Sequence, residues 1–473
     1  MKCKKILAML IAALMVLTLF AGCSKSQETS DGDTENNQQD KAVTDKGEKE
    51  KENVTLSFLY WADGVQKELV EKAVAEYEKA NPNVKINAEA LPATGEFAGI
   101  LESRKASGDL PDVSYMGEGD VVKYNEMGIL ADISSIFEGE NAPKKLEAIT
   151  IRDKDNRIIG VGLSNQLELL YYNKKMFDEA NIPYPSTKVE EAWTWDEFVE
   201  IAKKLTKDSN GKNATEKGFN PEMIETYGIA LSATQAFHNF WALYSNGGGV
   251  VSADGKEFLW DKPQSIEAFQ AYVDLINVHK VANPSTHGWW TGIGDVTTVD
   301  AGGAAMMFNG SWDLANIPNC SDPDNIGVGV LPKFNKAVTM NCGGPLVVYN
   351  TSKNLDEAMK FAEYMLDPSN NIPLLESGAW LPNEESWYTD EDKIALWTSK
   401  LPKDAVETIM SYSKTDGAIV QWPAYYVPAY AKMDAYLAGS EIDKVYSGEM
   451  TVKQLFDKIM PELKSMFESG TVE

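Results

Sequence analysis

Aromatic and acidic side chains directly follow the first predicted strand of this sequence. Residues 54–60 alternate apolar and small polar side chains, and Trp61-Ala-Asp-Gly64 comes next. A tryptophan ring can stack on the CH face of a sugar, and a carboxylate such as Asp63 accepts two hydroxyl hydrogen bonds. Asp63 also stands where a helix N-cap is expected, and the two roles are compatible. Further on, glycines in Gly117-Glu-Gly-Asp120 would let a ligand approach the backbone.

The composition excludes several kinds of ligand. The 473 residues include 71 acidic and 44 basic side chains, a net charge of −27, which argues against nucleic acid and against electrostatic docking to anionic lipid. Three histidines and no dense arginine cluster argue against an imidazole-rich metal centre and against an acidic ligand. We therefore expect no metal, no cofactor and no nucleic-acid partner. Twelve tryptophans exceed the needs of a core, and together with carboxylates and amides they suit an uncharged polyol.

The common catalytic motifs are absent. The sequence contains no Gly-x-Ser-x-Gly elbow, no Gly-x-x-x-x-Gly-Lys-Ser/Thr loop and no His-Glu-x-x-His. A glycoside hydrolase would need two carboxylates across the scissile bond. The chain has acids to spare, so composition leaves that alternative open, but no pair is marked. We expect a binding protein rather than an enzyme.

The elements that must position these loops begin with a βαβ pattern. After the strand at 54–60, apolar residues recur at helical spacing over 65–80, and Asn81-Pro82 ends that helix. Alternation returns over 84–88, which indicates a parallel sheet. Two capping boxes, Thr194-Trp-Asp-Glu197 and Thr451-Val-Lys-Gln454, predict further helix starts. The length suggests two or three domains.

The first 23 residues have the pattern of an export signal. Three lysines precede a 15-residue apolar run, which is too short to span a membrane comfortably, and the run ends at Ala21-Gly22-Cys23. This resembles a bacterial lipobox, with Phe20 where leucine is more usual, and it implies a diacylglycerol anchor on Cys23. A secreted protein with a chance cysteine is the alternative. Residues 24–53 are acidic and poor in hydrophobic side chains, so we expect a disordered linker whose length resembles Gram-positive lipoproteins.

Five motifs, in order, resemble the extracellular solute-binding proteins of sugar-type ABC importers. The first strand–helix–strand unit is one resemblance, and the motifs within the rest of the chain are Ser107-Gly-Asp-Leu-Pro-Asp-Val113, Leu170-Tyr-Tyr-Asn-Lys-Lys-Met-Phe177, Thr194-Trp-Asp-Glu-Phe198 and Gly302-Gly-Ala-Ala-Met-Met-Phe-Asn-Gly-Ser-Trp312. Each is weak alone. Their shared order, behind a lipobox and across about 54–470, carries the resemblance.

The resemblance implies an α/β, periplasmic-binding-protein-like (type II) fold. Two α/β lobes are joined by a multi-crossing hinge, with the ligand cleft between them. The implied crossings fall near 164–166, near 342–345 and after 378–382. The predicted organisation is a signal peptide at 1–22, lipidated Cys23 with a linker at 23–53, a first lobe at 54–164 plus 345–385, and a second lobe at 165–344 plus 386–473.

The resemblance also implies ligand contacts beyond the first loop. Polar candidates lie in loops and at the first crossing, where carboxylates and amides would bond sugar hydroxyls: Glu96, Glu118, Asp120, Asn165, Gln166 and Gln235. Aromatic candidates, in addition to Trp61, are Trp241, Trp312, Trp422 and Tyr425, with Trp312 where relatives stack a pyranose. Asp120 as a helix cap, Glu96 as a surface acid and Trp312 as a core residue are the structural alternatives.

The function implied is substrate binding for an ABC importer. The protein would be a monomer held on the extracellular face of the cell membrane by its lipid anchor alone, capturing a sugar, expected to be an oligosaccharide, for permease subunits. A non-sugar solute is the main alternative, and an adhesin or sensor using the same clamp is another. The sequence leaves open which sugar is bound and whether Cys320 and Cys342 form a disulfide.

Overall fold

The structure, a computed structural model, describes residues 53–470 apart from residues 93–96, 140–141, 232–235 and 284–294. The predicted signal segment, Cys23 and nearly all of the predicted linker lie outside the described residues, as do the predicted site residues Glu96 and Gln235. Within the described part, no helix combines the length and the apolar character needed to cross a membrane.

The predicted βαβ unit is confirmed. Strand β1 (Val54–Trp61) leads into helix α2 (Gly64–Ala80) and strand β2 (Val84–Leu91), which runs parallel to β1. Helix α2 packs by Val70, Ala73, Val74 and Tyr77 and ends at Asn81, whose backbone N–H caps it. This packing leaves Trp61, the last residue of β1, and Asp63, in the loop that follows, at the carboxyl end of a parallel strand, where ligands bind in open α/β sheets.

A six-stranded sheet contains this unit. Its order is β2-β1-β3-β12-β5-β4, and the remaining strands are β3 (Val113–Tyr115), β12 (Pro345–Val348), β5 (Ile158–Gly162) and β4 (Thr150–Arg152). Strand β12 arrives from far along the chain yet lies between β3 and β5, antiparallel to both. Its Leu346, Val347 and Val348 are fully buried, as expected for a strand covered on both faces.

A second, five-stranded sheet is built around β6 (Gln166–Asn173). One path runs β10-β6-β11-β13, and β9 pairs with β6 as well. The bounds are β9 (Met306–Gly310), β10 (Ile326–Gly329), β11 (Thr339–Cys342) and β13 (Ile419–Gln421). All eight residues of β6 are buried, and its two faces lie in different hydrophobic clusters. Leu167, Leu169 and Tyr171 belong to the cluster that also contains the first sheet, which we call the first core, and Leu170 and Tyr172 belong to the second core.

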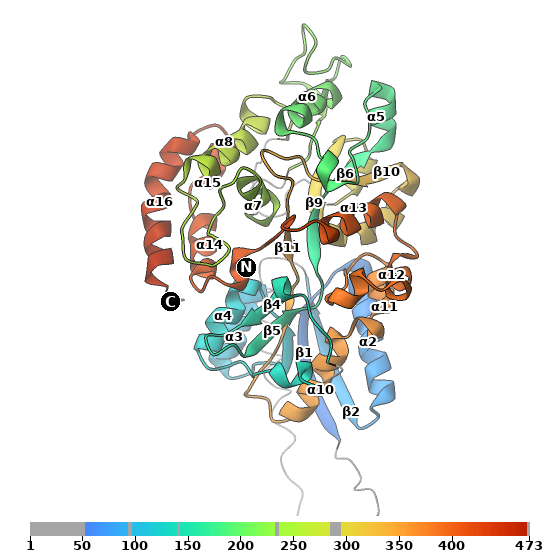
Figure 1. The fold of residues 1–473 in the computed structure, drawn as a ribbon, viewed down its shortest axis with the longest axis vertical. Coiled ribbons are helices and arrows are strands. Elements are labelled where there is room, and N and C mark those ends of the chain that lie inside the picture. Colours follow the sequence, from blue (N-terminus) through green and yellow to red (C-terminus); the bar gives the residue numbers. More distant parts are fainter. Residues whose placement is uncertain (1–52, 93–96, 140–141, 232–235, 284–294, 471–473) are drawn as a thin grey trace, which may run out of the picture. The chain divides into compact units, whose positions relative to one another are not determined.

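Each sheet carries its own set of helices (Figure 1). With the first sheet belong α2 and the helices α3 (Phe97–Ser107), α4 (Glu118–Glu126), α10 (Leu355–Leu366), α11 (Ile372–Glu376), which packs on α2, and α12 (Glu391–Thr398), which packs on α11. With the second sheet belong α5 (Lys174–Ala180), α6 (Trp195–Leu205), α7 (Ala236–Ser245), α8 (Pro263–Asn277), α9 (Thr297–Asp300), α13 (Lys403–Lys414), α14 (Tyr430–Ala438), α15 (Ile442–Tyr446) and α16 (Val452–Ser469). We call the first sheet with its helices the first lobe, and the second sheet with its helices the second lobe.

Both predicted capping boxes are present. The Thr194 hydroxyl accepts from the Glu197 N–H, and the Glu197 carboxylate accepts from the Thr194 N–H at 2.8 Å, which starts α6. Thr451 and Gln454 make the same reciprocal pair at the start of α16. These local signals therefore fix two helix starts in the second lobe.

The two thiols of the described part are free. Cys320 is buried at the end of the 3-10 helix η4 (Ser311–Asn319), and Cys342 is half-buried at the end of β11. Burial raises the pKa of both thiols. The structure thus contains no bridge between these two cysteines.

Candidate functional site

Three chain segments cross between the lobes and are hydrogen-bonded to one another. The first, residues 163–165, joins β5 to β6, and the second, Gly343-Gly344, joins β11 to β12. The Ser164 N–H donates to the Gly343 carbonyl at 3.2 Å. The third crossing reaches α13 of the second lobe only after α12 ends at Thr398. It begins at residues 379–382, where the Leu381 N–H donates to the Ser164 hydroxyl at 2.7 Å. The crossings therefore form one bundle rather than three independent linkers.

The carboxylate of Glu118 lies against this bundle. Glu118 begins helix α4 of the first lobe and is only 7% exposed. One of its oxygens accepts from the N–H groups of Gly343 and Gly344, at 3.0 and 3.1 Å, and from the Tyr425 hydroxyl at 3.3 Å. Burial raises the pKa of Glu118, and these hydrogen bonds oppose the rise. One carboxylate oxygen of Glu118, a predicted ligand contact, therefore accepts three hydrogen bonds from the protein itself.

Glycine is required at both positions of the second crossing. A Cβ on Gly343 would lie 2.3 Å from the Ser164 carbonyl oxygen and 2.9 Å from the Tyr425 hydroxyl. Gly344 has φ of +56°, and a Cβ there would lie 3.1 Å from the Trp61 ring. The absence of side chains brings Trp61, Glu118 and Tyr425 close to the same crossing.

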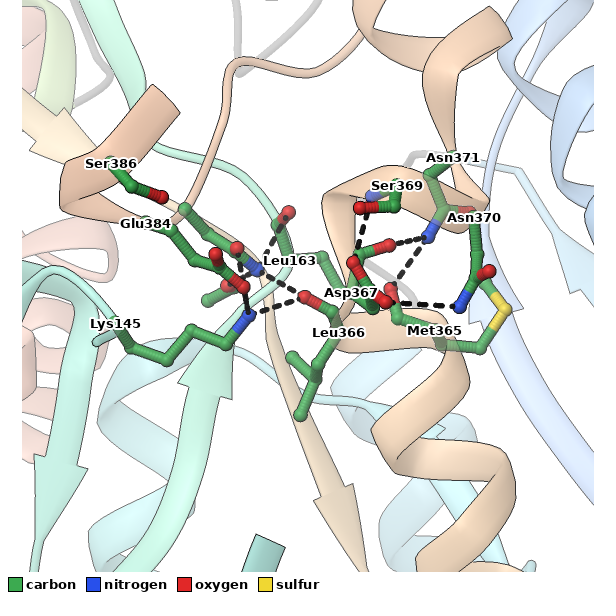
Figure 2. Close-up of polar contacts among 12 residues, drawn as sticks. Lys145, Leu163, Met365, Leu366, Asp367, Ser369, Asn370, Asn371, Glu384 and Ser386 are labelled. Carbon is green, nitrogen blue, oxygen red and sulfur yellow. Dashed lines mark hydrogen bonds and ion pairs between the residues drawn. The ribbon is translucent and has the colours of Figure 1, made fainter. Parts of the chain in front are cut away.

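A buried ion pair anchors the third crossing (Figure 2). The Lys145 ammonium lies 2.6 Å from the Glu384 carboxylate, and both side chains are less than a tenth exposed. Lys145 also donates to the Leu366 carbonyl at 2.6 Å and to the Asn383 side chain at 3.1 Å. Burial lowers the pKa of Lys145, whereas Glu384 opposes that fall. The neighbouring Asn383 amide donates to the Gly162 carbonyl, so this cluster holds the crossing on the first sheet.

The predicted amide residues brace the first crossing. The Gln166 amide donates to the Ala379 carbonyl at 2.6 Å, and its oxygen accepts from the Ser311 hydroxyl. The Asn165 oxygen accepts from the Asn341 amide at 3.2 Å. Both side chains are buried. These hydrogen bonds favour a role in holding the crossings together over direct recognition of hydroxyls.

Trp61 lies at the edge of the first lobe beside the second crossing. Its half-buried ring meets the rings of Phe97 and Tyr115 edge to face, at centroid distances of 4.9 and 5.2 Å. Asp63 is exposed at the N-cap of α2, and its carboxylate makes no capping hydrogen bond. The capping alternative for the Asp63 side chain is therefore wrong, and its ligand role stays a prediction.

Trp312 lies on the second lobe, directly after β9, at the start of the 3-10 helix η4. Its ring crosses directly over Gly310, because a Cβ on that glycine would stand 2.1 Å from the ring. The neighbouring Ser311 hydroxyl donates to the Gln166 side chain and accepts from the Leu167 N–H, at the start of β6 directly after the first crossing. The Trp312 side chain is half-buried against the second core. The Trp312 ring therefore has one face against the backbone of Gly310 and is still partly exposed, as a ring that stacks on a ligand must be.

The remaining predicted aromatics near the crossings lie after β13. The Trp422 indole donates to the Tyr430 hydroxyl at 2.8 Å, and its ring packs against both cores. Tyr425, in the 3-10 helix η8 (Pro423–Tyr425), is 2% exposed and directs its hydroxyl at Glu118. Trp422 therefore remains half-buried near the crossings, whereas Tyr425 is committed to the protein interior.

Asp120 follows Glu118 on α4 and faces the second lobe. It is half-buried, and burial raises its pKa. Asp434 on α14 has its pKa raised to about 6, chiefly by burial and then by the charge of Asp120. A Cβ on the intervening Gly119 would lie 3.1 Å from the Ala431 side chain. Helices α4 and α14 are thus in contact across the two lobes, with two acids at the contact.

Comparison with known proteins assigns this arrangement to a family. The model of the bacterial extracellular solute-binding proteins matches residues 61–372, more than half of the chain. The chain belongs to that family. This solute-binding protein is 25% identical to the multiple sugar-binding protein of Streptococcus mutans over 309 residues, which are 63% of this chain and 67% of that protein. It is 23% identical to the arabinooligosaccharide-binding protein of Halalkalibacterium halodurans over 242 residues, 49% of this chain and 48% of the relative.

Solved structures share the fold of this solute-binding protein. An ABC substrate-binding protein of Listeria monocytogenes in complex with cycloalternan matches with a TM-score of 0.69 and 21% identity, covering 89% of this chain and 98% of that one. A solute-binding protein of Thermotoga lettingae bound to α-D-tagatose matches with a TM-score of 0.71 and 19% identity, covering 87% and 99%. The predicted type II fold, with two α/β lobes, is thereby confirmed.

Trp241, another predicted ligand contact, lies away from the crossings inside the second core. It is 0% exposed, with its ring edge to face against Phe308 at 5.3 Å and tilted against Trp195 at 6.4 Å. This position favours packing over ligand stacking. Glu96 and Gln235 lie outside the described residues, so their roles stay predictions.

Sequence reasoning missed several residues that organise the site. Lys145 and Glu384 are 239 positions apart, and Asn341 is 176 positions from Asn165, the predicted residue to which it donates. No local pattern marks such pairs, since each depends on the three crossings lying together. Ser311 could have been found, because it directly precedes Trp312 in the same motif. Among the described residues, no three His, Cys, Asp or Glu side chains are grouped as metal ligands are.

Proposed function

We propose that this chain is the substrate-binding lipoprotein of an ABC importer, and that it captures an oligosaccharide between its lobes for delivery to membrane permeases. The observation that carries the proposal is the pair of half-buried tryptophans, Trp61 and Trp312, one on each lobe beside the crossings. The named ligands of the relatives and of the matched structures, which include multiple sugars, arabinooligosaccharides and cycloalternan, support a carbohydrate.

The proposed ligand-facing residues come from both lobes. Trp61 and Trp312 supply stacking faces, and the carboxylates of Asp63 and Asp120 accept hydrogen bonds from hydroxyl groups. Trp422 adds an aromatic side chain near the crossings. A ligand that touches both lobes makes more contacts when they are closed, so binding shifts the population toward the closed form.

The proposed lobe boundaries are those implied by the sequence, 54–164 plus 345–385 for the first lobe and 165–344 plus 386–473 for the second. Every strand of the first sheet lies within the first pair of ranges, and every strand of the second sheet within the other. Helix α12 packs on α11 of the first lobe, which supports moving the last boundary beyond Thr398.

Isothermal titration calorimetry against a panel of oligosaccharides, monosaccharides and non-sugar solutes tests the proposal. We expect binding of at least one oligosaccharide and its recovery intact by chromatography, since the proposed role involves no bond cleavage. Binding only of amino acids or other non-sugar solutes would contradict the ligand class. Release of shorter sugars by the pure protein would contradict the non-enzymatic role.

We also propose that Cys23 carries the lipid anchor, on the extracellular face of a Gram-positive cell, and that the protein acts as a monomer. The motive is the apolar run that ends at Ala21-Gly22-Cys23. Cys23→Ala should be released into the medium or remain unprocessed. Membrane fractionation measures this, and a Cys320→Ala variant is the matched control because that thiol is buried far along the chain. A Cys23→Ala protein that is processed and fractionates with membranes like the parent would contradict the anchor.

A further inference from the structure

Glu118 has an unusual set of partners for a buried acid. It lies at the first position of α4, and its hydrogen bonds within the described part of the chain come from backbone N–H groups and a hydroxyl rather than from Lys or Arg. Two backbone N–H groups of the second crossing and the positive end of its own helix compensate its charge. These partners move little when two lobes rotate about the crossings, because they belong to the crossing itself and to α4.

The third partner behaves differently. Tyr425 follows β13, the edge strand of the second sheet. Its own ring lies in the first core, whereas its neighbours Ala424 and Val427 lie in the second core, so the backbone of this segment is held by the second lobe. Glu118 belongs to α4, which packs on β5 and β12 of the first sheet. The hydrogen bond between the Tyr425 hydroxyl and Glu118 therefore joins the lobes through a contact that rotation of one lobe would break.

A second observation extends the same contact. Gly119, next to Glu118, packs so tightly on Ala431 of α14 that an added Cβ would lie 3.3 Å from the Ala431 backbone. The start of α4 is thus seated on η8 and α14 of the second lobe over several residues. The Tyr425 hydroxyl thus makes its hydrogen bond within a close-packed surface, at which Asp120 and Asp434 are also found.

We propose that Glu118 is a positioning residue, whose carboxylate clasps Tyr425 to the second crossing and so holds the two lobes in the closed arrangement. The clasp consists of Glu118, Gly343, Gly344 and Tyr425. It touches no ligand, and it favours closure equally for every ligand that the cleft accepts. The proposal rests on the proposed function, because it assumes that closure accompanies binding.

The test compares two buried tyrosine hydroxyls. Tyr425→Phe removes the inter-lobe bond and leaves the ring in place. Tyr349→Phe is the matched control, because the buried Tyr349 hydroxyl bonds Ser114 at 2.9 Å on the first sheet alone. Affinities for three oligosaccharides that differ in hydroxyl configuration are measured by calorimetry, and the radius of gyration of the unliganded protein by small-angle scattering.

Tyr425→Phe should weaken binding of all three sugars by the same factor, roughly fivefold, the size expected for one net hydrogen bond. It should also increase the unliganded radius. Tyr349→Phe should lower the melting temperature without either effect. Glu118→Gln should act like Tyr425→Phe, and the double variant should lose less than the product of the two single losses.

Three outcomes overturn the clasp. They are equal affinities and radii for Tyr425→Phe and the parent, the same affinity loss in Tyr349→Phe as in Tyr425→Phe, and a Glu118→Gln loss that differs from sugar to sugar, which would place Glu118 on the ligand. If the parent protein binds no sugar at all, the proposed function fails. The scattering comparison still decides the clasp in that case, because it needs no ligand.

Discussion

Glu118 and Glu384 are both 7% exposed and both lie beside a crossing, but their partners differ in kind. Glu384 is paired with Lys145, and the partners of Lys145 and Asn383 belong to the first lobe or to the crossing held on it (Figure 2). Glu118 takes backbone N–H groups and a hydroxyl that belongs to the other lobe. Glu384 thus stabilises one lobe, whereas Glu118, as proposed, stabilises the arrangement of the two lobes. The origin of the partners separates the two roles, whereas burial does not.

The strongest way to sharpen this comparison is to break the ion pair. Lys145→Met leaves Glu384 buried without its cation, which should cost about 3–5 kcal/mol of unfolding free energy. Urea denaturation measures this. Affinity for the ligand should stay within about twofold of the parent, since the hydrogen bonds of Lys145 all belong to the first lobe or to the crossing held on it.

A companion variant keeps the ion-pair prediction decidable if Lys145→Met folds poorly. Lys145→Met combined with Glu384→Leu removes both charges and should recover most of the lost stability, because replacing a buried pair by apolar side chains is often neutral. No recovery in the double variant would show that the hydrogen bonds to Leu366 and Asn383, rather than the charge pair, matter most.

Trp312 and Trp241 allow a similar comparison between an aromatic side chain proposed to bind ligand and one that stabilises a lobe. Trp312→Ala should weaken sugar binding by about 2 kcal/mol, roughly thirtyfold, while the protein remains folded. Trp241→Ala should destabilise the protein by about 3–5 kcal/mol, because Trp241 fills the second core. Melting temperature and affinity are measured on both variants. A stable Trp312→Ala protein with parental affinity would remove Trp312 from the site.

A smaller, pH-dependent effect is expected where α4 meets α14. The pKa of Asp434 is raised from 3.8 to about 6 in this arrangement, and opening would expose it to water. Between pH 3.8 and about 6, Asp434 is protonated in the closed form and ionised in the open form. Protonation of Asp434 therefore favours closure fully below about pH 4, and this contribution is lost as the pH rises through 6.

Calorimetry from pH 5 to 8 checks this expectation. Affinity of the parent should fall several-fold across that interval, and Asp434→Asn should flatten the profile because it removes the ionisation against Asp120. Burial also raises the pKa of Asp120; Lys123 and Lys105 oppose that rise, and Glu102 adds to it. Asp434→Asn leaves these neighbouring charges in place, so the difference between the two profiles reports on Asp434 itself. A parent profile that is flat or rises with pH would contradict the role of Asp434.

Local signals predicted local structure well. The βαβ opening, the helix end at Asn81 and the capping boxes at Thr194 and Thr451 depend on neighbours a few positions apart, and all are present. The family motifs pointed to residues that lie at or next to the crossings, among them Trp312, whose neighbour Ser311 bonds Gln166. What the side chains do there depends on partners far away, since Glu118 meets Gly343 across 225 positions and Gln166 meets Ala379 across 213. The sequence predicted that these residues matter, but their roles required the assembled crossings.

The place of β12 in the first sheet has a consequence for the order of folding. Residues 345–348 fill the gap between β3 and β5, so the amino-terminal sheet stays divided until most of the chain is available. The second sheet needs only residues 166–342 for four of its five strands, and β13 is added at its edge. Contacts between distant segments form slowly, because the closure of long loops must precede them. A chain emerging amino terminus first would therefore hold β1–β3 and β4–β5 as two separate parts until residues 345–348 follow β11, and the second sheet would gain its edge strand β13 last.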